Sequence, residues 1–205
     1  MIPRAVLLVL ALALLLALGS APAGAQPSAS SREVEKLYAR GLAGDKAAVE
    51  ECITALEAVL QDQPQNQFAR VYLGSALTLR SRDMSFGPNK LKVLKQGVAT
   101  MDEAVAAAPG DPKVRLARAL TTQALPFFLG RASSTRQDFA DLAAAAQREP
   151  GKFERRDLQI IFFNAALAAK KEGDKKRAAA LLKEAQRMPV DATLARKVDA
   201  ELASP

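Results

Sequence analysis

The chain has 205 residues, with 29 lysines and arginines against 22 aspartates and glutamates, one cysteine and no histidine. The lack of histidine removes the commonest general base, the usual serine and cysteine triads and most zinc sites, so we expect no catalytic, metal or cofactor site. One cysteine excludes an intramolecular disulfide, and the net charge of +7 is spread along the chain rather than clustered as in nucleic-acid-binding proteins.

The first 25 residues have the layout of a secretory signal peptide. Arg4 precedes an apolar run over residues 5–18, and Ala23-Gly24-Ala25 forms a cleavage signature before Gln26. Such a leader is removed on export, so we expect a periplasmic or secreted protein that begins near Ala25/Gln26 with a disordered linker over residues 26–30. A leader retained as a membrane anchor is the alternative. No later segment approaches the roughly 18 apolar residues that a spanning helix needs.

The rest of the chain is predicted to be helical. Asp45 and Asp111 are N-cap candidates, and Ser134 with Gln137 has the spacing of a capping box. No segment alternates apolar and polar residues over a useful length, so no strand is expected. These signals, with the glycines and prolines that end helices, predict helices over residues 31–42, 45–63, 67–82, 88–108, 111–124, 134–148, 153–171, 175–187 and 191–202.

Two apolar patterns predict buried helix faces. We expect the thiol of Cys52 to be a core group rather than a redox or dimer-forming one, because it lies on a stripe of helical spacing: Val49, Cys52, Ile53, Leu56 and Leu60. The helix over 153–171 is apolar on more than one face, which favours burial between two neighbours over an exposed interaction patch. Its large apolar residues are Ile160, Ile161, Phe162, Phe163 and Leu167.

Prolines recur at near-regular intervals through the helical region. Pro64, Pro109, Pro150 and Pro189 are separated by 45, 41 and 39 residues, and each ends an alanine-rich stretch. Periods of this size are typical of solenoids, in which hairpins of two helices stack side by side. The predicted fold is therefore an all-α array of about four hairpins. Residues 190–205 form a capping helix and C-terminus, because one narrow apolar stripe suits a terminal helix.

The last hairpin, up to Pro189, resembles a tetratricopeptide repeat. Ala166 stands where the two helices cross in that family, and Gly173-Asp174 stands where the chain turns. The second helix has the returning alanines and the large apolar site of the family at Ala178, Leu182 and Ala185. The earlier hairpins match positions of the family less closely, at Tyr72, Leu73, Gly74, Gly97, Met101, Ala104 and Ala119. The resemblance implies a tetratricopeptide-like α-α solenoid over residues 31–189.

In tetratricopeptide arrays, the first helix of each hairpin lines a groove that receives peptides or partner helices. The resemblance therefore implies a protein–protein interaction module or assembly scaffold with a peptide or protein partner. The helix over 111–124 has Arg115, Arg118 and Thr122 on the face opposite Leu116, Ala119 and Leu120. On the helix over 67–82, Arg70 lies on a face away from Leu73 and Leu77. If these arginines line the groove, it suits an acidic partner. The alternative is that they lie on ordinary solvated faces.

Other surfaces leave alternatives open. Phe127 and Phe128, in the connector after Pro126, either pack into the gap left by that break or anchor a partner, and we favour packing. A membrane-associated scaffold would bind anionic lipid through Lys90-Leu91-Lys92 and Lys170-Lys171. An envelope enzyme or enzyme subunit is the least favoured alternative, and nucleic acid is not an expected partner.

Overall fold

The computed structural model describes residues 29–203. Within this range there are nine α-helices, two single-turn 3-10 helices and no strand. The elements are α2 (Ala29–Leu42), α3 (Lys46–Asp62), α4 (Gln67–Asp83), α5 (Pro88–Ala107), α6 (Pro112–Gln123), η1 (Phe127–Leu129), α7 (Ala132–Arg148), η2 (Pro150–Lys152), α8 (Arg155–Lys171), α9 (Lys175–Gln186) and α10 (Ala192–Ala203). The expected signal peptide lies outside the described residues, and the last two residues of the expected linker belong to α2.

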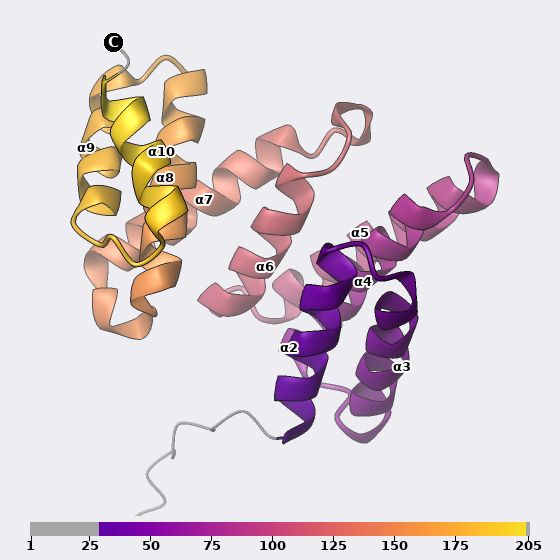
Figure 1. Ribbon diagram of the computed structural model, residues 1–205. Helices are drawn as coiled ribbons and strands as arrows, with labels where there is room; N and C mark the ends of the chain where they lie inside the picture. The colour runs from indigo at the N-terminus through magenta and orange to yellow at the C-terminus, as the bar shows by residue number, and fades with distance from the viewer. Residues whose placement is uncertain (1–28, 204–205) are drawn as a thin grey trace, which may run out of the picture.

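The helices form successive hairpins, α2–α3, α4–α5, α6–α7 and α8–α9, and α10 packs on the last of them (Figure 1). Each helix contacts the next along the chain, and α2, α4 and α6, the first helices of three hairpins, also contact one another in turn. The predicted all-α array of helical hairpins is confirmed. The turns within hairpins lie at one edge of this array, and the connections between hairpins lie at the other edge.

Capping side chains explain why most predicted boundaries hold to within two residues. The Asp45 carboxylate accepts the backbone N–H of Ala48 at 3.0 Å. The Asp111 carboxylate accepts those of Lys113 and Val114 at 2.8 and 3.3 Å. Each bond satisfies an N–H group that the first helical turn leaves without a partner.

The predicted start of the helix over 134–148 is wrong. The helix α7 begins at Ala132, so Ser134 already lies inside it. The Ser134 hydroxyl donates to the carbonyl oxygen of Arg131 at 3.0 Å, which is bonding back into the preceding turn and not capping. The helix predicted over 153–171 begins two residues late, at Arg155, because η2 occupies part of the connection.

Both predicted buried faces are confirmed, except that Leu60, Ile160 and Leu167 are only partly buried. Cys52 is 1% exposed in a cluster formed by α2, α3 and α4. Burial raises the pKa of its thiol to about 11, so the thiol stays protonated at neutral pH. Ile161, Phe162 and Phe163 of α8 are buried in a second cluster that extends from α6 to α10.

The helices α4 and α5 approach each other closely at two glycines. A Cβ atom on Gly74 would lie 2.6 Å from the carbonyl oxygen of Gly97, and one on Gly97 would lie 2.6 Å from that of Gly74. Both residues must therefore be glycine for the two backbones to touch. Met101 fills the space beside this crossing and is completely buried. Paired helices approach this closely only where side chains are absent.

Candidate functional site

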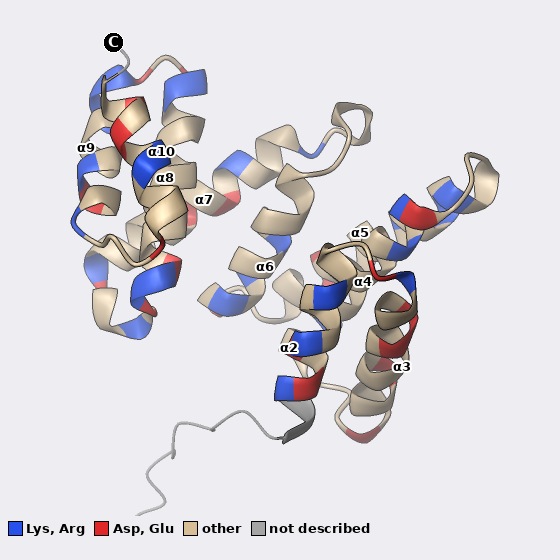
Figure 2. Ribbon diagram, viewed as in Figure 1, with Lys and Arg blue, Asp and Glu red and all other residues tan. Residues whose placement is uncertain are grey.

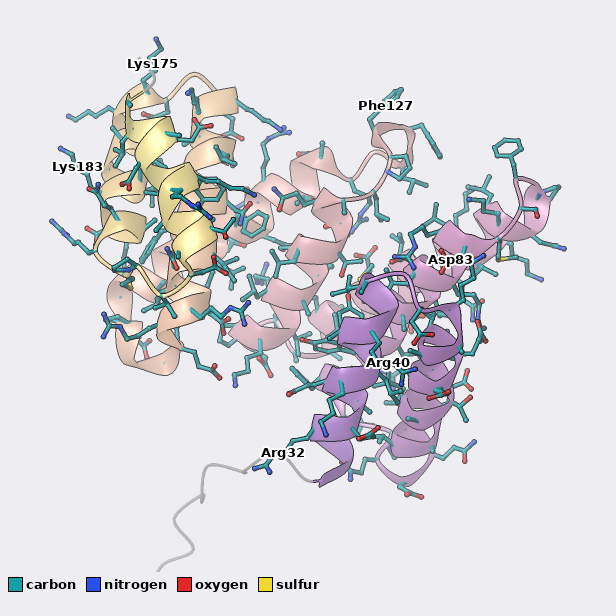
Figure 3. The ribbon with its side chains drawn as sticks, viewed as in Figure 1. Arg32, Arg40, Asp83, Phe127, Lys175 and Lys183 are labelled. Atoms are coloured by element: carbon teal, nitrogen blue, oxygen red, sulfur yellow. The ribbon has the colours of Figure 1, made fainter. Side chains whose placement is uncertain are left out.

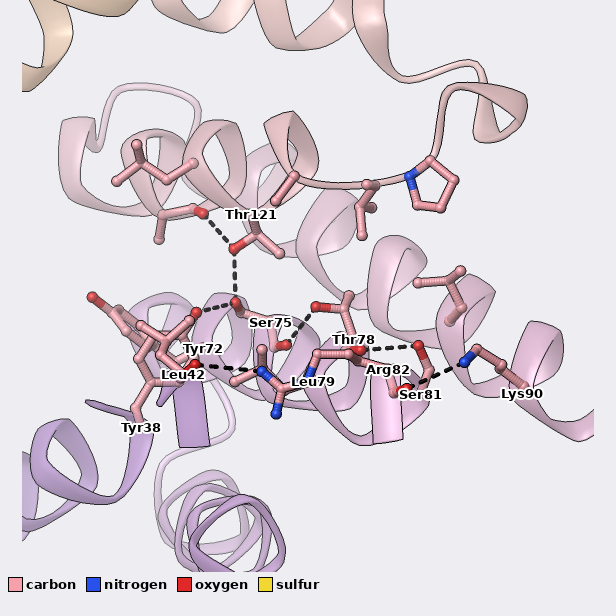
Figure 4. A pocket seen from close by; sticks show the side chains of 16 residues that line it. Tyr38, Leu42, Tyr72, Ser75, Thr78, Leu79, Ser81, Arg82, Lys90 and Thr121 are labelled. Carbon is pink, nitrogen blue, oxygen red and sulfur yellow. Dashed lines mark hydrogen bonds between the residues drawn. The ribbon is translucent and has the colours of Figure 1, made fainter. Parts of the chain in front are cut away.

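A cavity lies between α2, α4 and α6 and has a volume of about 490 Å³ (Figure 4). Volumes of this order hold small ligands or the anchoring side chains of a partner. Its walls are mostly apolar, from Leu42, Leu79, Leu94, Ala117, Leu120, Ala124, Leu125 and Pro126. Leu42 and Leu120 are 56% and 40% exposed, so the walls offer apolar surface that no part of the described chain covers. We refer to this site as the α2–α4–α6 cavity.

A chain of hydroxyl groups crosses the floor of the cavity and ties its three helices together (Figure 4). Thr121 Oγ1 donates to the carbonyl oxygen of Ala117 at 2.9 Å. Its single proton is thereby used, so Ser75 Oγ donates to Thr121 Oγ1 at 2.7 Å, and Tyr38 Oη donates to Ser75 Oγ at 2.5 Å. These hydroxyls have no proton left for a ligand, and the floor offers only acceptor lone pairs.

The two tyrosines of the cavity stay neutral at physiological pH. Their rings meet edge to face, with centroids 5.1 Å apart. Burial raises the pKa of Tyr38, and it raises that of Tyr72 to about 12. Neither phenol is therefore ionised as a general base near pH 7.

Cationic groups lie at the end of the cavity near the α4–α5 turn. Arg82 donates from Nε and Nη2 to the Asp83 carboxylate, both at 2.8 Å, and from Nη2 to the carbonyl oxygen of Gly41 at 3.0 Å. Lys90 Nζ donates to the carbonyl oxygens of Arg82 and Met84 at 3.2 and 3.1 Å. Asp83 offsets the charge of Arg82, and an ammonium has three N–H donors, so Lys90 retains both a charge and a donor for an acidic group.

The structure places Arg115 and Arg118 against α7, away from the cavity. Arg118 donates to both oxygens of Asp138, with distances of 2.9 and 2.6 Å, and to Asp102 at 3.1 Å. Arg115 donates to Asp138 at 3.0 Å and to Asp141 at 3.1 Å. The side chain of Asp138 is 3% exposed and those of Arg118 and Arg115 are 13% and 20% exposed. These groups join α5, α6 and α7 rather than forming an open cationic surface.

Arg70 also has partners within the chain. It donates from Nη2 to the carbonyl oxygen of Pro64 at 2.7 Å and from Nε to the Gln67 amide oxygen at 3.1 Å. Its guanidinium lies 3.9 Å from Glu103. Arg70 therefore closes the connection between α3 and α4, and it does not line the α2–α4–α6 cavity.

The predicted division of α6 into an outer polar face and an inner apolar face is partly wrong. Thr122, placed with the arginines on an outer face, is 4% exposed, and its hydroxyl bonds to that of Thr135 at 2.8 Å. Leu120, placed with the inner stripe, is exposed and lines the cavity. The cause is that α6 is packed on two sides, by α4–α5 and by α7, so its two faces do not divide into core and solvent.

The preference for packing of the connector rings is also wrong. Phe127 is 90% exposed and Phe128 is 65% exposed, and their ring centroids lie 6.3 Å apart. Pro126 and Leu125 of the same connector line the cavity. The rings of Phe127 and Phe128 therefore do not fill the break at Pro126.

A pattern of hydroxyl-bearing residues in the sequence could have indicated the cavity, but the prediction is based on the apolar stripes. Ser75, Thr78 and Ser81 recur every three residues on α4, and Tyr38 and Thr121 are the matching hydroxyl residues of α2 and α6. A hydroxyl-bearing face on the first helices of neighbouring hairpins marks the wall of the groove. Their cross-helix pairing, however, depends on the packing of the hairpins and is not visible in the sequence.

Searches for related proteins and for other kinds of site add no assignment. Comparison with protein-family models, with curated proteins and with solved structures gives no match to this chain. Residues 29–203 hold no group of three or more Cys, Asp and Glu side chains that could bind a metal ion. No helix within the same range is both long and apolar enough to cross a membrane.

Proposed function

We propose that this protein is an interaction module of tetratricopeptide-repeat type that binds a segment of a partner protein in the α2–α4–α6 cavity. The observation that carries the proposal is the position of the cavity between the first helices of three successive hairpins. Helical arrays present their concave surface there, and a partner segment can contact several repeats at once.

The chemistry of the cavity indicates the kind of segment. Apolar walls favour aliphatic or aromatic side chains, each of which gains about 1.5–3 kcal/mol on full burial. The floor hydroxyls accept but do not donate, so a backbone or side-chain N–H of the partner suits them. Lys90 at one end of the cavity suits an acidic side chain or a C-terminal carboxylate. The partner segment is thus an apolar stretch with an acidic group at one end.

Site-specific photo-crosslinking tests this assignment. A photoreactive side chain is placed at Leu120, on the cavity wall, or at Val190, an exposed apolar position away from the cavity. The crosslinks are made in cells that express the complete chain, and the products are identified by mass spectrometry. We expect a discrete partner protein from position 120 and none from position 190.

A cavity-filling substitution shows whether the partner enters the cavity. Ala124 lies on the cavity wall with an exposed side chain, and Ala99 is an exposed alanine of α5 outside the cavity. Ala124→Trp should abolish the crosslink from position 120, and Ala99→Trp should leave it unchanged. Equal crosslinking in both variants would show that the cavity is not the binding site. Recovery of lipid alone from position 120 would contradict a protein partner in the cavity.

We propose that the protein works outside the cytoplasm. The support is the cleavage signature at Ala23-Gly24-Ala25 after an apolar run. Mass spectrometry of the protein isolated from cells should give Gln26 as the first residue. A retained leader would instead favour the anchored alternative.

A further inference from the structure

One edge of the array differs chemically from the other. The turns within hairpins, each with one helical turn on either side, cover residues 39–49, 80–91, 120–135 and 168–178. We name this surface the tip edge. The connections between hairpins, taken in the same way, cover residues 59–70, 104–115, 145–158 and 183–195, and we name them the base edge. In Figure 1 the four tips all lie at the upper ends of their helices.

Positive charge is concentrated on the tip edge (Figure 2). It has a net charge of +7, whereas the base edge, although it contains more charged residues, has a net charge of +2. The basic residues of the tip edge are Arg40, Lys46, Arg80, Arg82, Lys90, Arg131, Lys170, Lys171, Lys175, Lys176 and Arg177, and its acidic residues are Asp45, Asp83, Glu172 and Asp174. The remaining described residues are net acidic, so the net positive charge is greater on the tip edge than on the rest of the described array.

Several of these lysines donate no hydrogen bond to a carboxylate, although Lys90 lies close enough to Asp83 for an electrostatic interaction. Lys90 donates only to two carbonyl oxygens. Lys175 and Lys176, the first two residues of α9, form no ion pair with a described residue, and Lys175 points outward in Figure 3. These lysines are available to an external anion without breaking an existing contact.

Exposed apolar side chains gather on the same edge. Seven large apolar residues of the described chain are exposed, and six of them lie on the tip edge: Leu42, Phe86, Leu91, Leu120, Phe127 and Phe128. Phe86 in the α4–α5 turn is fully exposed, and Phe127 in the next turn is 90% exposed and projects away from the molecule in Figure 3. The seventh, Val190, lies on the base edge.

We propose that the tip edge docks on the surface of an anionic lipid bilayer. In this arrangement Phe86, Phe127 and Phe128 enter the interface between headgroups and acyl chains, and the unpaired lysines contact the headgroups. Aromatic rings inserted beside lysines are the chemistry by which peripheral proteins bind such surfaces.

The shape of the surface favours a bilayer over a protein partner. The three rings stand on two separate turns, and all three are more than half exposed. A protein would need a matching pocket for each tip, because hot spots are buried in packed surroundings. A bilayer interface accepts separately projecting rings without such complementarity. This inference does not depend on what occupies the α2–α4–α6 cavity.

Tryptophan fluorescence tests the contact residue by residue, because the chain has no tryptophan of its own. Phe86→Trp and Phe127→Trp report on two tips, and Val190→Trp is the matched control on the base edge. The complete chain carrying each substitution is mixed with vesicles of phosphatidylglycerol and phosphatidylcholine, or of phosphatidylcholine alone. We expect a blue shift of the emission at positions 86 and 127 with the anionic vesicles only, and no shift at position 190.

Vesicle sedimentation measures how much the edge contributes to binding. Phe86→Ser/Phe127→Ser/Phe128→Ser should weaken partitioning onto anionic vesicles at least about tenfold, since each ring removes apolar area from the interface. Lys175→Glu/Lys176→Glu should weaken it by a similar factor, since each lysine near the surface contributes about a factor of five. The matched control is Arg155→Glu/Arg156→Glu, which changes the first two residues of α8 on the base edge.

The outcomes distinguish membrane binding through the tip edge from binding through net charge or through an N-terminal leader. Equal blue shifts at positions 86, 127 and 190, or none at any of them, would overturn the proposal. So would equal losses from the α9 and α8 charge reversals, because these would report net charge alone. An N-terminal leader retained on the protein would bind vesicles too, but it would not produce a shift confined to the tips.

Discussion

Asp138 of α7 pairs with two arginines of α6, and we expect its replacement to destabilise the protein strongly. The residue is buried and accepts three hydrogen bonds from Arg115 and Arg118. Asp138→Asn keeps the shape of the side chain but removes its charge. The mostly buried guanidinium of Arg118 then loses the carboxylate that accepts two of its hydrogen bonds. Breaking a buried ion pair from one side costs about 3–5 kcal/mol, out of a typical total of about 5–15 kcal/mol.

Chemical and thermal denaturation followed by circular dichroism measure this loss. We expect the free energy of unfolding to fall by about 3 kcal/mol and Tm to fall by about 6–12 °C, at about 2–4 °C per kcal/mol for a chain of this length. Asp141→Asn is the matched control. The Asp141 side chain is 44% exposed and shares Arg115 with Asp138, so its loss should cost less than about 1 kcal/mol.

A double substitution distinguishes lost pairing from lost packing. Arg118→Met/Asp138→Leu removes both charges and leaves Arg115 with Asp141 and Asp102 with Arg131. It should be more stable than Asp138→Asn alone, because no buried charge is left without a partner. Equal effects of Asp138→Asn and Asp141→Asn, both below about 1 kcal/mol, would refute this reasoning.

Three further predictions concern other contacts. Gly74→Ala should lower the free energy of unfolding in urea by about 1–3 kcal/mol, because its Cβ would meet the Gly97 carbonyl, whereas Gly110→Ala, in open space, should not. Cys52 should react with an aromatic disulfide reagent at pH 8 only as fast as the protein opens, since it is 1% exposed with a pKa of about 11; immediate labelling would contradict its burial. The backbone N–H groups of α10 lower the pKa of Asp191, so its stabilisation is present above the ordinary aspartate pKa and is lost as pH falls through the lowered value. Asp191→Ala should therefore lower Tm at pH 7 but not at about pH 2, and an equal loss at both would exclude the capping charge as the cause.

The fold was largely predictable because its signals are local. Asp45, Asp111 and Asp174 cap helices through bonds to residues two or three positions ahead, and such spacing is visible in the sequence. The apolar stripe through Cys52 likewise follows from the 3.6-residue period of a helix. The cap predicted at Ser134 shows the limit of the rule, since the same hydroxyl can bond back into a helix that has already begun.

The candidate site was less predictable because it depends on which helices face each other. Arg115 and Arg118 have the spacing of an outer face, and nothing local shows that Asp138, twenty residues further along, lies against them. Ser75 and Thr121 are 46 residues apart, and only the stacking of α4 on α6 brings their hydroxyls to 2.7 Å. The apolar connector at Phe127 and Phe128 predicts packing into the helix break, but both rings are exposed.

The helices, their order and their grouping into hairpins follow from local sequence, because helix starts, turns and buried stripes depend on residues within about two helical turns of each other. The tertiary structure alone decided which arginines are neutralised, where a cavity remains and which edge carries the exposed rings and free lysines. Those features arise between hairpins, where the distance between two groups depends on how whole helices cross and not on their separation along the chain.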